Sequence, residues 1–394
     1  MKSSVPFNLL IKPIGSACNL RCDYCFYIDK YKIVSEGRQS PSPMSDELLE
    51  ISIKQYIESQ PSGIGEIIFS WQGGEPLLLG IDFFRKVVRL QKTYAPPGVR
   101  ISNSLQTNGT LVTKEFARFF KEHSFLVGIS IDGSEELHDK FRKDRSGNGS
   151  FSRVMKGYEY LKDEGVDVNI LTSVNSHNSE HPHEVYAFLT SIGATYIQFI
   201  PIGKANGTCD CPYSVGAEQW GSFLCHVFDL WKERDIGKVF VQHFDMLLAR
   251  YMNYPATLCV HAPLCGRAIV LEHNGKIYSC DHFVDHDHEL GNITKESIVS
   301  MLNSEKQIRF GRSKIDNLSM GCKECEFLPL CFGGCLRNRR ERSSPSSKKP
   351  SNYLCDGYRA FYAHTRPYFS AMAVALRNRK EAKDYIQFLN SNND

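Results

Sequence analysis

Near its amino terminus the chain reads Ala17-Cys-Asn-Leu-Arg-Cys-Asp-Tyr-Cys-Phe-Tyr27, in which Cys18, Cys22 and Cys25 follow the spacing CxxxCxxC. Three thiolates at this spacing can anchor one small inorganic cluster. A cubane cluster has four irons, so three protein thiolates leave one iron open, where a small molecule can be bound and reduced. The spacing therefore predicts an enzyme with a [4Fe-4S] cluster.

A structural zinc site is the alternative interpretation of these cysteines. Zinc prefers four closed protein ligands. The first 120 residues contain no histidine, and no fourth cysteine lies near the run. The surroundings therefore favour the iron–sulfur cluster over zinc.

Length and composition limit the remaining possibilities. A chain of 394 residues with 42% hydrophobic residues predicts two or three cores, or one barrel with an appendage. The formal charge of +3 is small for this size, so we expect no nucleic-acid partner. No apolar run reaches the ~20 residues of a membrane span, and the stretch 7–11 is shorter than a signal-peptide core. We therefore expect a cytoplasmic protein without membrane association.

The fourteen cysteines are better explained by metal ligation than by disulfides. Cytosolic reductants keep thiols reduced, and a fold of this size does not need covalent cross-links. Eight of the cysteines lie in the segment 259–355. Eight thiolates can form two four-thiolate cages, although CxxC pairs such as Cys322 and Cys325 also occur in tetrathiolate zinc sites.

The first half of the chain alternates short β-branched runs with segments of helical period, which predicts six βα units and a parallel sheet. The predicted strands are 7–12, 66–71, 100–105, 126–131, 167–173 and 196–200. The predicted helices are 46–59, 82–94, 114–123, 151–164, 184–192 and 217–231. We expect an α/β fold, a partial (β/α)6 barrel over residues 1–235, followed by a cysteine-rich domain over residues 236–394.

Polar motifs follow the first four predicted strands. The cysteine run follows the first strand, Gln72-Gly-Gly-Glu-Pro76 the second, Gln106-Thr-Asn-Gly109 the third and Asp132-Gly133 the fourth. In a β/α barrel, catalytic residues gather on the loops after the carboxyl ends of the strands. The four motifs are therefore expected to converge on one face.

The cysteine run and the Gly-Gly-Glu-Pro run resemble those of the radical S-adenosylmethionine (SAM) superfamily. The resemblance implies that the cluster held by Cys18, Cys22 and Cys25 binds SAM. It also implies a set of SAM contacts: Tyr27, Gly73, Gly74, Glu75, Ser130 and Arg142. Asp132 fits a ligand role and a turn before Gly133 equally well.

The eight later cysteines resemble the SPASM-type extension of radical SAM peptide-modifying enzymes, which carries two auxiliary [4Fe-4S] clusters. The resemblance assigns Cys259, Cys265, Cys280 and Cys335 to the first auxiliary cluster. It assigns Cys322, Cys325, Cys331 and Cys355 to the second. Cys209, Cys211 and Cys225 fall outside both patterns and are expected to be free thiols.

A more specific similarity is to anaerobic sulfatase-maturating enzymes. It rests on Lys12-Pro-Ile-Gly, Trp71-Gln-Gly-Gly-Glu-Pro, Ser102-Asn-Ser-Leu-Gln-Thr-Asn-Gly-Thr-Leu111, Cys280-Asp281 and Cys331-Phe-Gly-Gly-Cys335. Enzymes of this family oxidise a Cys or Ser of a sulfatase polypeptide to Cα-formylglycine. The resemblance implies SAM, three [4Fe-4S] clusters and an external one-electron reductant of the flavodoxin or ferredoxin type. It also implies Asp281 as the catalytic base and Gln72 as a substrate contact.

Two other functions are compatible with parts of this pattern. A related radical enzyme could modify another peptide, for example by forming a thioether crosslink. Many such enzymes carry an amino-terminal peptide-binding domain, for which the residues before Cys18 leave no room. The second alternative is a zinc-containing binding protein without redox activity.

Overall fold

The computed structural model describes residues 2–30, 33, 42–203, 211–340 and 350–389. The chain divides into two compact units, each assembled from separate stretches of sequence. The first comprises Met1–Ser130, Asp139–Val168 and Cys265–Arg312, and the second Ile131–His138, Asn169–Leu264 and Ser313–Asp394. The domain boundary after residue 235 stays a prediction.

The first unit contains a sheet whose strands lie in the order β10-β9-β8-β1-β2-β3-β4. Its strands are β1 (Asn8–Lys12), β2 (Glu66–Trp71), β3 (Arg100–Thr107), β4 (Phe125–Ser130), β8 (Ala268–Glu272), β9 (Lys276–Tyr278) and β10 (Glu289–Asn292). Strands β8, β1, β2, β3 and β4 pair in parallel, whereas β9 and β10 are antiparallel. Parallel strands are typically covered on both faces, which explains buried residues such as Leu9, Phe69 and Val127.

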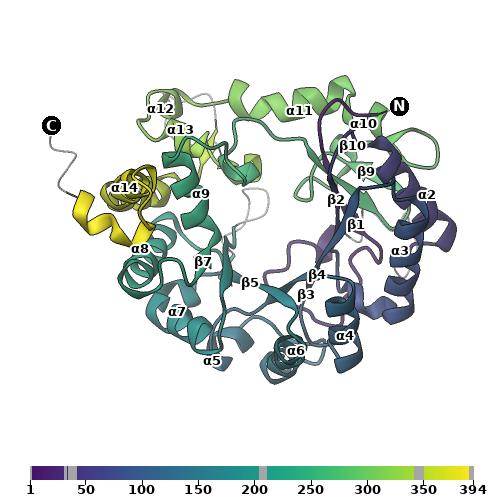
Figure 1. Cartoon of the computed structure of the whole chain (residues 1–394), viewed down its shortest axis with the longest axis horizontal. Helices are drawn as coiled ribbons and strands as arrows, with labels where there is room; N and C mark the ends of the chain where they lie inside the picture. The colour runs from purple at the N-terminus through teal and green to yellow at the C-terminus, as the bar shows by residue number, and fades with distance from the viewer. Residues whose placement is uncertain (1, 31–32, 34–41, 204–210, 341–349, 390–394) are drawn as a thin grey trace. The chain divides into compact units, whose positions relative to one another are not determined.

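Helices of the first unit lie along one side of β1, β2 and β3 (Figure 1). They are α2 (Asp46–Ser59), α3 (Ile81–Tyr94) and α4 (Lys114–Glu122). The unit also contains α6 (Phe151–Asp163), α10 (Ile298–Leu302) and the start of α11 (Glu305–Asp316). The Ser45 and Thr113 side chains accept backbone hydrogen bonds at the starts of α2 and α4. These caps satisfy amide groups that have no partner within the helix. The unit also has short 3-10 turns: η1 (Ile28–Lys30), η2 (Pro76–Leu79) and η5 (His286–His288).

The second unit contains three parallel strands in the order β5-β6-β7. They are β5 (Asp167–Val174), β6 (Tyr196–Pro201) and β7 (Phe240–Val241), and a separate pair is formed by β11 (Arg339–Arg340) and β12 (Ser351–Asn352). Its helices are α5 (Glu135–Asp139), α7 (Pro182–Ser191), α8 (Ala217–Arg234), α9 (Gln242–Tyr251), α12 (Met320–Lys323), α13 (Leu328–Cys331) and α14 (Cys355–Arg377). Its 3-10 turns are η3 (Asn178–Glu180), η4 (Cys259–His261), η6 (Leu336–Asn338) and η7 (Ala382–Phe388).

Helices α8 and α14 approach each other closely at two glycines. A Cβ on Gly221 would lie 2.7 Å from the Cα of Gly357, and a Cβ on Gly357 would lie 2.0 Å from the carbonyl oxygen of Ala217. A side chain at either position would push the helices apart. Within the described ranges, no helix is both long enough and apolar enough to cross a bilayer.

The six predicted strands and six predicted helices are all present, with ends within three residues of those expected. The sequence analysis did not predict β8, β9, β10, α9 or α14. Strand β8 is a five-residue run that pairs with β1, more than 250 positions earlier in the chain. No local sequence pattern indicates that β8 pairs with β1, so this pairing is established only by the tertiary structure.

A buried polar network ties α3 to β2 and β3. The indole nitrogen of Trp71 and the amide nitrogen of Gln91 each donate to Asn103 Oδ1 at 2.8 Å. Asn103 Nδ2 in turn donates to Gln91 Oε1 at 2.9 Å. All three side chains are buried, so each polar group depends on the others for a partner.

Replacing Asn103 with alanine should lower the free energy of unfolding by about 2–4 kcal/mol, because the Trp71 and Gln91 donors lose their buried acceptor. Anaerobic urea unfolding of the reconstituted protein measures this change. Asn378→Ala is the control, because its side chain donates to Val374 at an exposed position, and its cost should stay within about 0.5 kcal/mol. Equal losses in the two variants would contradict the role of the network.

Candidate active site

Two loops at the carboxyl ends of β1 and β2 are joined through their backbones. The amide nitrogen of Gly74 donates to the carbonyl of Gly15 at 2.7 Å, and that of Glu75 donates to the carbonyl of Ala17 at 2.8 Å. A Cβ on Gly74 would lie only 1.8 Å from the Ala17 oxygen. The glycine is therefore required for the close approach of the cysteine loop.

The Glu75 carboxylate joins a third loop to these two. It is fully buried, and Oε1 accepts hydrogen bonds from Thr107 Oγ1 at 2.8 Å and from the Leu77 amide at 3.0 Å. Oε2 accepts from the Asn108 amide at 2.7 Å. Burial raises the pKa of Glu75 to about 7, while these hydrogen bonds oppose the rise by favouring the carboxylate. Glu75 is thus a structural bridge in this structure, and its contact with SAM stays a prediction.

The side chain of Asn108 extends this bridge to the first cysteine. Asn108 Nδ2 donates to Asn19 Oδ1 at 2.9 Å and lies 3.6 Å from Cys18 Sγ, which also accepts from the Leu20 amide at 3.4 Å. Burial, followed by the nearby Glu75, raises the pKa of the Cys18 thiol to about 11. A bound cation would reverse this effect and stabilise the thiolate. The donors around the sulfur and its buried position fit a metal-bound thiolate.

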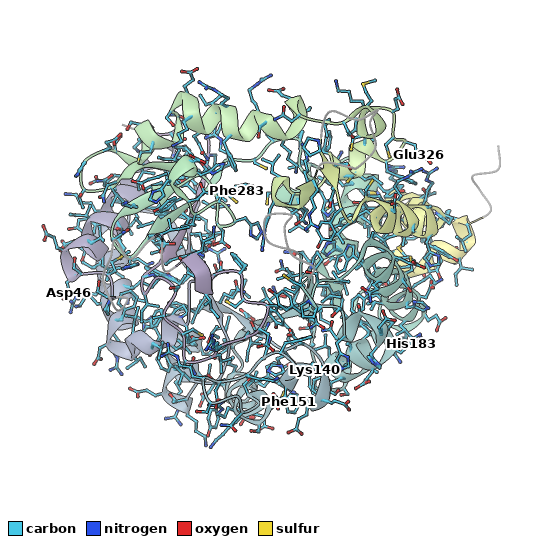
Figure 2. All side chains as sticks on the ribbon, turned by 180° about the vertical axis from the view of Figure 1, so that it is seen from behind. Asp46, Lys140, Phe151, His183, Phe283 and Glu326 are labelled. Atoms are coloured by element: carbon cyan, nitrogen blue, oxygen red, sulfur yellow. The ribbon has the colours of Figure 1, made fainter. Side chains whose placement is uncertain are left out.

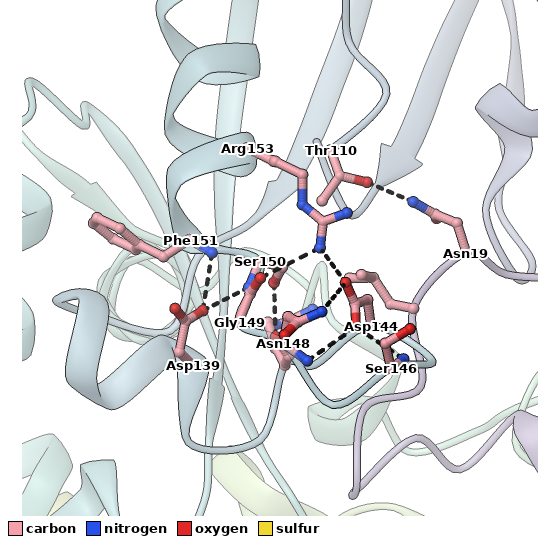
Figure 3. A network of polar contacts seen from close by, with 12 residues as sticks. Asn19, Thr110, Asp139, Asp144, Ser146, Asn148, Gly149, Ser150, Phe151 and Arg153 are labelled. Atoms are coloured by element: carbon pink, nitrogen blue, oxygen red, sulfur yellow. Dashed lines mark hydrogen bonds and ion pairs between the residues drawn. The ribbon is translucent and has the colours of Figure 1, made fainter.

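The loop before α6 is organised by two aspartates, as Figure 3 shows. Asp144 accepts from the amides of Ser146 and Asn148, both at 2.9 Å, and pairs with Arg153 at 3.1 Å. Asp139 accepts from the amides of Ser150 at 2.8 Å and of Phe151 at 2.9 Å, where α6 begins. These bonds fix a loop that would otherwise have many backbone conformations.

The fixed loop lies against the cysteine loop and carries Arg142. The Arg21 amide donates to the Lys143 carbonyl at 2.8 Å, and Arg145 donates to the Cys18 carbonyl at 2.9 Å. The Arg142 side chain is buried, with its guanidinium 5.5 Å from the centroid of the Tyr24 ring. Ser130, at the end of β4, is also buried. Contacts of Arg142 and Ser130 with SAM stay predictions.

Charged side chains gather where β1 and β8 end. Lys12 and Glu272 are register partners on these strands, and both are fully buried. The Lys12 ammonium pairs with the Asp281 carboxylate and lies 3.5 Å from the centroid of the Tyr27 ring. The Tyr27 hydroxyl donates to Glu272. Burial, and then the charge of Glu272, raise the pKa of Tyr27 well above its usual value, so it remains a phenol.

The turn that carries Cys280 and Asp281 is held from two directions. The ring of Phe283, labelled in Figure 2, lies 4.8 Å from that of His288 and 5.3 Å from that of Phe310. The amide of the buried Gln307 donates to the carbonyls of Gly266 at 2.8 Å and Ser279 at 3.3 Å. Gln307 therefore joins the two segments that carry Cys265 and Cys280.

Four cysteines of the second unit line one cavity of about 230 Å³. They are the predicted ligands of the second auxiliary cluster: Cys322, Cys325, Cys331 and Cys355. A water molecule takes up ~30 Å³ in the liquid, so the cavity has room for a cluster of several atoms. Burial raises the pKa of Cys331 to about 11, with smaller contributions from Cys355 and Cys322. These grouped thiols fit a four-thiolate cluster.

The predicted ligands of the first auxiliary cluster come from different stretches of sequence, two in each unit. Cys265 and Cys280 belong to the first unit, whereas Cys259 and Cys335 belong to the second, where the charge of Cys259 helps to raise the pKa of Cys335 after burial. Their common cluster stays a prediction. In the described part of the chain, no group of three His, Cys, Asp or Glu side chains is placed to hold a single metal ion.

The three remaining cysteines have different positions. Cys225 lies on α8, where burial raises its pKa to about 11, and Cys211 is half-buried after β6. Cys209 lies outside the described residues. Their interpretation as free thiols stays a prediction.

Comparison with known proteins decides the family. Residues 13–189 match the radical SAM superfamily, and residues 264–326 match SPASM, an iron–sulfur cluster-binding domain. The serine-type anaerobic sulfatase-maturating enzyme of Bacteroides thetaiotaomicron is 42% identical over 402 residues, covering 98% of this chain and 95% of that protein. The cysteine-type enzyme of Clostridium novyi is 35% identical over 380 residues, covering 95% of this chain and 99% of that protein. The chain belongs to the anaerobic sulfatase-maturating enzymes.

Solved structures agree with this assignment. The structure of native anSMEcpe with bound AdoMet and Cp18Cys peptide matches with a TM-score of 0.83 at 34% identity, covering 93% of this chain and 99% of that one. Streptococcus suis SuiB bound to S-adenosylmethionine matches with a TM-score of 0.62 at 16% identity, covering 85% of this chain and 74% of that one, and so shares only the fold. The predicted α/β class, a radical SAM partial barrel with a carboxyl-terminal cysteine-rich iron–sulfur domain, is confirmed.

Three of the four predicted loop motifs are in direct contact within the first unit of this sulfatase-maturating enzyme. They are the cysteine run, the Gly-Gly-Glu-Pro run and the Gln-Thr-Asn-Gly run. The fourth, Asp132-Gly133, belongs to the second unit, where Asp132 Oδ1 accepts from the Ser173 amide at 2.8 Å. This bond shows a structural role for the Asp132 carboxylate.

The sequence analysis assigned no individual role to Asn108, Lys12 or Glu272. A signal for the last two was present, because each is a charged residue directly after an apolar strand run, in Leu-Leu-Ile-Lys12 and Ile-Val-Leu-Glu272. Charged residues are rarely buried without a partner. Such a position therefore indicates either the end of a strand or a buried ion pair.

Gly74→Ala should prevent the cysteine loop from closing, because the new methyl group would overlap the Ala17 carbonyl. After anaerobic reconstitution, iron analysis should show a loss of about four irons per chain, the content of one cubane. Gly65→Ala is the matched control, since nothing lies within 4 Å of a Cβ at that position. Full iron content in Gly74→Ala would refute the proposed constraint.

Proposed function

We propose that this enzyme oxidises one Cys or Ser residue of a sulfatase polypeptide to Cα-formylglycine and converts SAM into methionine and 5′-deoxyadenosine. The observation that carries the proposal is the similarity, over nearly the whole chain, to serine-type and cysteine-type anaerobic sulfatase-maturating enzymes. The neighbouring structure with bound AdoMet and a peptide supports the same substrate and cofactor.

Three [4Fe-4S] clusters and SAM are the proposed cofactors. Cys18, Cys22 and Cys25 would hold the cluster that binds SAM. Ser130 and Arg142 would contact SAM together with the predicted residues Tyr27, Gly73, Gly74 and Glu75. When bound, these cofactors supply the radical that removes a hydrogen atom from the substrate Cβ and the acceptor for a second electron. The four-cysteine cavity of the second unit supports the second auxiliary cluster.

The oxidation also requires a base from the protein. After the Cβ–H bond breaks, the target side chain must lose one electron and the proton of its S–H or O–H bond as the double bond to carbon forms. A Ser target gives the aldehyde directly, whereas a Cys target gives a thioaldehyde, which water hydrolyses to the aldehyde and sulfide. The proposed base is Asp281, which would receive that proton. Its neighbour Cys280 would help to hold the auxiliary cluster, which would supply the electron acceptor. The half-buried position of Asp281 supports this role. Gln72, at the carboxyl end of β2, is the proposed substrate contact.

The near full-length relatives favour this function over a thioether-forming enzyme and over a zinc-containing binding protein. We propose that the protein acts in the cytoplasm under anaerobic conditions, with a flavodoxin- or ferredoxin-type protein as one-electron reductant. The many cysteines proposed as iron ligands support this setting, because a reducing compartment keeps their thiols available for metal binding. The small net charge supports the absence of a nucleic-acid partner, and we propose no membrane partner.

The decisive experiment is anaerobic incubation of the reconstituted enzyme with SAM, reductant and paired sulfatase peptides that differ only in Cys or Ser at the target position. Mass spectrometry should show formylglycine in at least one peptide, with 5′-deoxyadenosine formed alongside it. The variant with Ala at Cys18, Cys22 and Cys25 is the control and should form no deoxyadenosine. An intramolecular crosslink in the peptide, or no mass change with either peptide, would overturn the proposal.

Asp281→Asn should lower the rate of formylglycine formation by about 10²- to 10⁴-fold, the usual contribution of a positioned base. It should lower SAM cleavage much less, because the base acts after hydrogen-atom removal. Quantifying both products in the same reaction separates the two effects. Asp287→Asn, in an exposed part of the same turn region, is the control. A normal aldehyde yield in Asp281→Asn would remove Asp281 from the role of base.

A further inference from the structure

Lys12 is a buried cation whose only expected role was to mark a family motif. It is the last residue of β1, and its side chain is completely shielded from solvent. A lysine in such a position must be paired, because an isolated ammonium is strongly destabilised away from water. The identity of its partners therefore indicates what the residue does.

The Lys12 ammonium has partners on two sides. On one side it pairs with the carboxylate of Asp281. On the other it lies over the ring of Tyr27, 3.5 Å from the centroid, with the ring of Phe26 at 5.9 Å. An ammonium this close to an aromatic face is attracted to the ring, and more strongly in a desolvated site.

The ring of Tyr27 is itself fixed. Its hydroxyl donates to Glu272, which is fully buried and is the register partner of Lys12 on β8. Because Lys12 and Glu272 are paired in parallel strands, their side chains leave the sheet on the same side. The result is a continuous chain of contacts: Glu272 to the Tyr27 hydroxyl, the Tyr27 ring to the Lys12 ammonium, and the ammonium to Asp281.

Asp281, at one end of this series of contacts, is partly accessible to solvent, whereas the side chains behind it are not. About 20% of the Asp281 side chain is exposed, whereas Lys12 and Glu272 are inaccessible. A purely structural ion pair does not need one exposed carboxylate, and a buried pair is often replaceable by apolar side chains without loss of stability. An exposed carboxylate held from behind can instead contact a substrate in a fixed orientation.

We propose that Lys12 is the positioning residue for Asp281, holding its carboxylate toward the target side chain during proton transfer. The proposal rests on the function proposed above. Asp281 has two side-chain torsions, and the ammonium restricts both by holding one carboxylate oxygen. Small misplacements of reacting groups cost large factors in rate, so the loss of this restraint should appear in turnover.

The test compares Lys12→Met, Asp281→Asn and the double variant as reconstituted enzymes with the better of the two peptides. Lys12→Met should lower kcat for formylglycine by about 10- to 100-fold, with KM for the peptide changed less than about twofold. The yield of formylglycine per 5′-deoxyadenosine should fall in parallel. Lys12→Arg keeps the charge and should recover part of this yield.

The double variant decides whether Lys12 acts through Asp281. If it does, Lys12→Met/Asp281→Asn should be no slower than Asp281→Asn alone, because the restraint has nothing left to position. Losses that multiply in the double variant would overturn the proposal, as would an unchanged aldehyde yield in Lys12→Met. Lys54→Met is the matched control, because Lys54 is an exposed lysine 5.6 Å from the Tyr94 ring.

Iron content and urea unfolding midpoints distinguish positioning from misfolding. If Lys12→Met does not bind about twelve irons per chain, Lys12→Gln, which keeps a neutral donor, replaces it in the same cycle. The double variant lacks both charges of the ion pair and should fold more readily than Lys12→Met, which leaves the carboxylate without its cation. If the unmodified enzyme forms no formylglycine, the proposed function fails and the assignment of Lys12 fails with it. If the unmodified enzyme forms formylglycine and the Lys12 variants form it equally well, the assignment of Lys12 fails while the proposed function stands.

Discussion

One buried carboxylate, that of Glu75, determines how the loops of the first unit meet. It accepts hydrogen bonds from Thr107, the last residue of β3, and from Asn108, which follows it, while the backbone amide of Glu75 donates to the carbonyl of Ala17 in the cysteine loop. A buried carboxylate without such donors would cost several kcal/mol, so the three loops are stable only together. The cysteine loop therefore has its shape from protein contacts, and the cluster is expected to bind to a site that is already formed.

The same unit carries, at consecutive positions, the residues proposed for electron and proton transfer. Cys280 is a proposed cluster ligand and Asp281 the proposed base, and the turn that carries them is fixed by Phe283 and Gln307. An oxidation that removes an electron from the Cβ radical and a proton from the adjacent S–H or O–H group requires both acceptors near the substrate. Because Cys280 and Asp281 are adjacent, one turn of the backbone would bring both acceptors to the substrate. The buried Lys12 would hold the Asp281 carboxylate in place.

Burial has opposite consequences for the thiols before and after metal binding. It raises the pKa values of Cys18 and Cys331 to about 11, so the metal-free protein holds them as neutral thiols. Iron would bind the thiolates and release the protons, which couples cluster assembly to pH. Hydrogen bonds such as that from the Leu20 amide to Cys18 would help to set the potential of a cluster held there.

The sequence alone determined the six βα units through local periodicity. Cysteine spacing indicated the cluster, and the resemblance of motifs such as 102–111 to known enzymes indicated SAM and the family. Through motifs the sequence also predicted Glu75 as a SAM contact and Asp281 as the base. It did not reveal that Glu75 is a bridge between loops, that Asn108 contacts Cys18, or that Lys12 and Glu272 are neighbours. Those relations were decided by the parallel pairing of β1 with β8 and by the packing of loops that lie far apart in the chain. The physical reason is that a buried charge acquires its role from the partners that folding brings to it, and no local pattern specifies those partners.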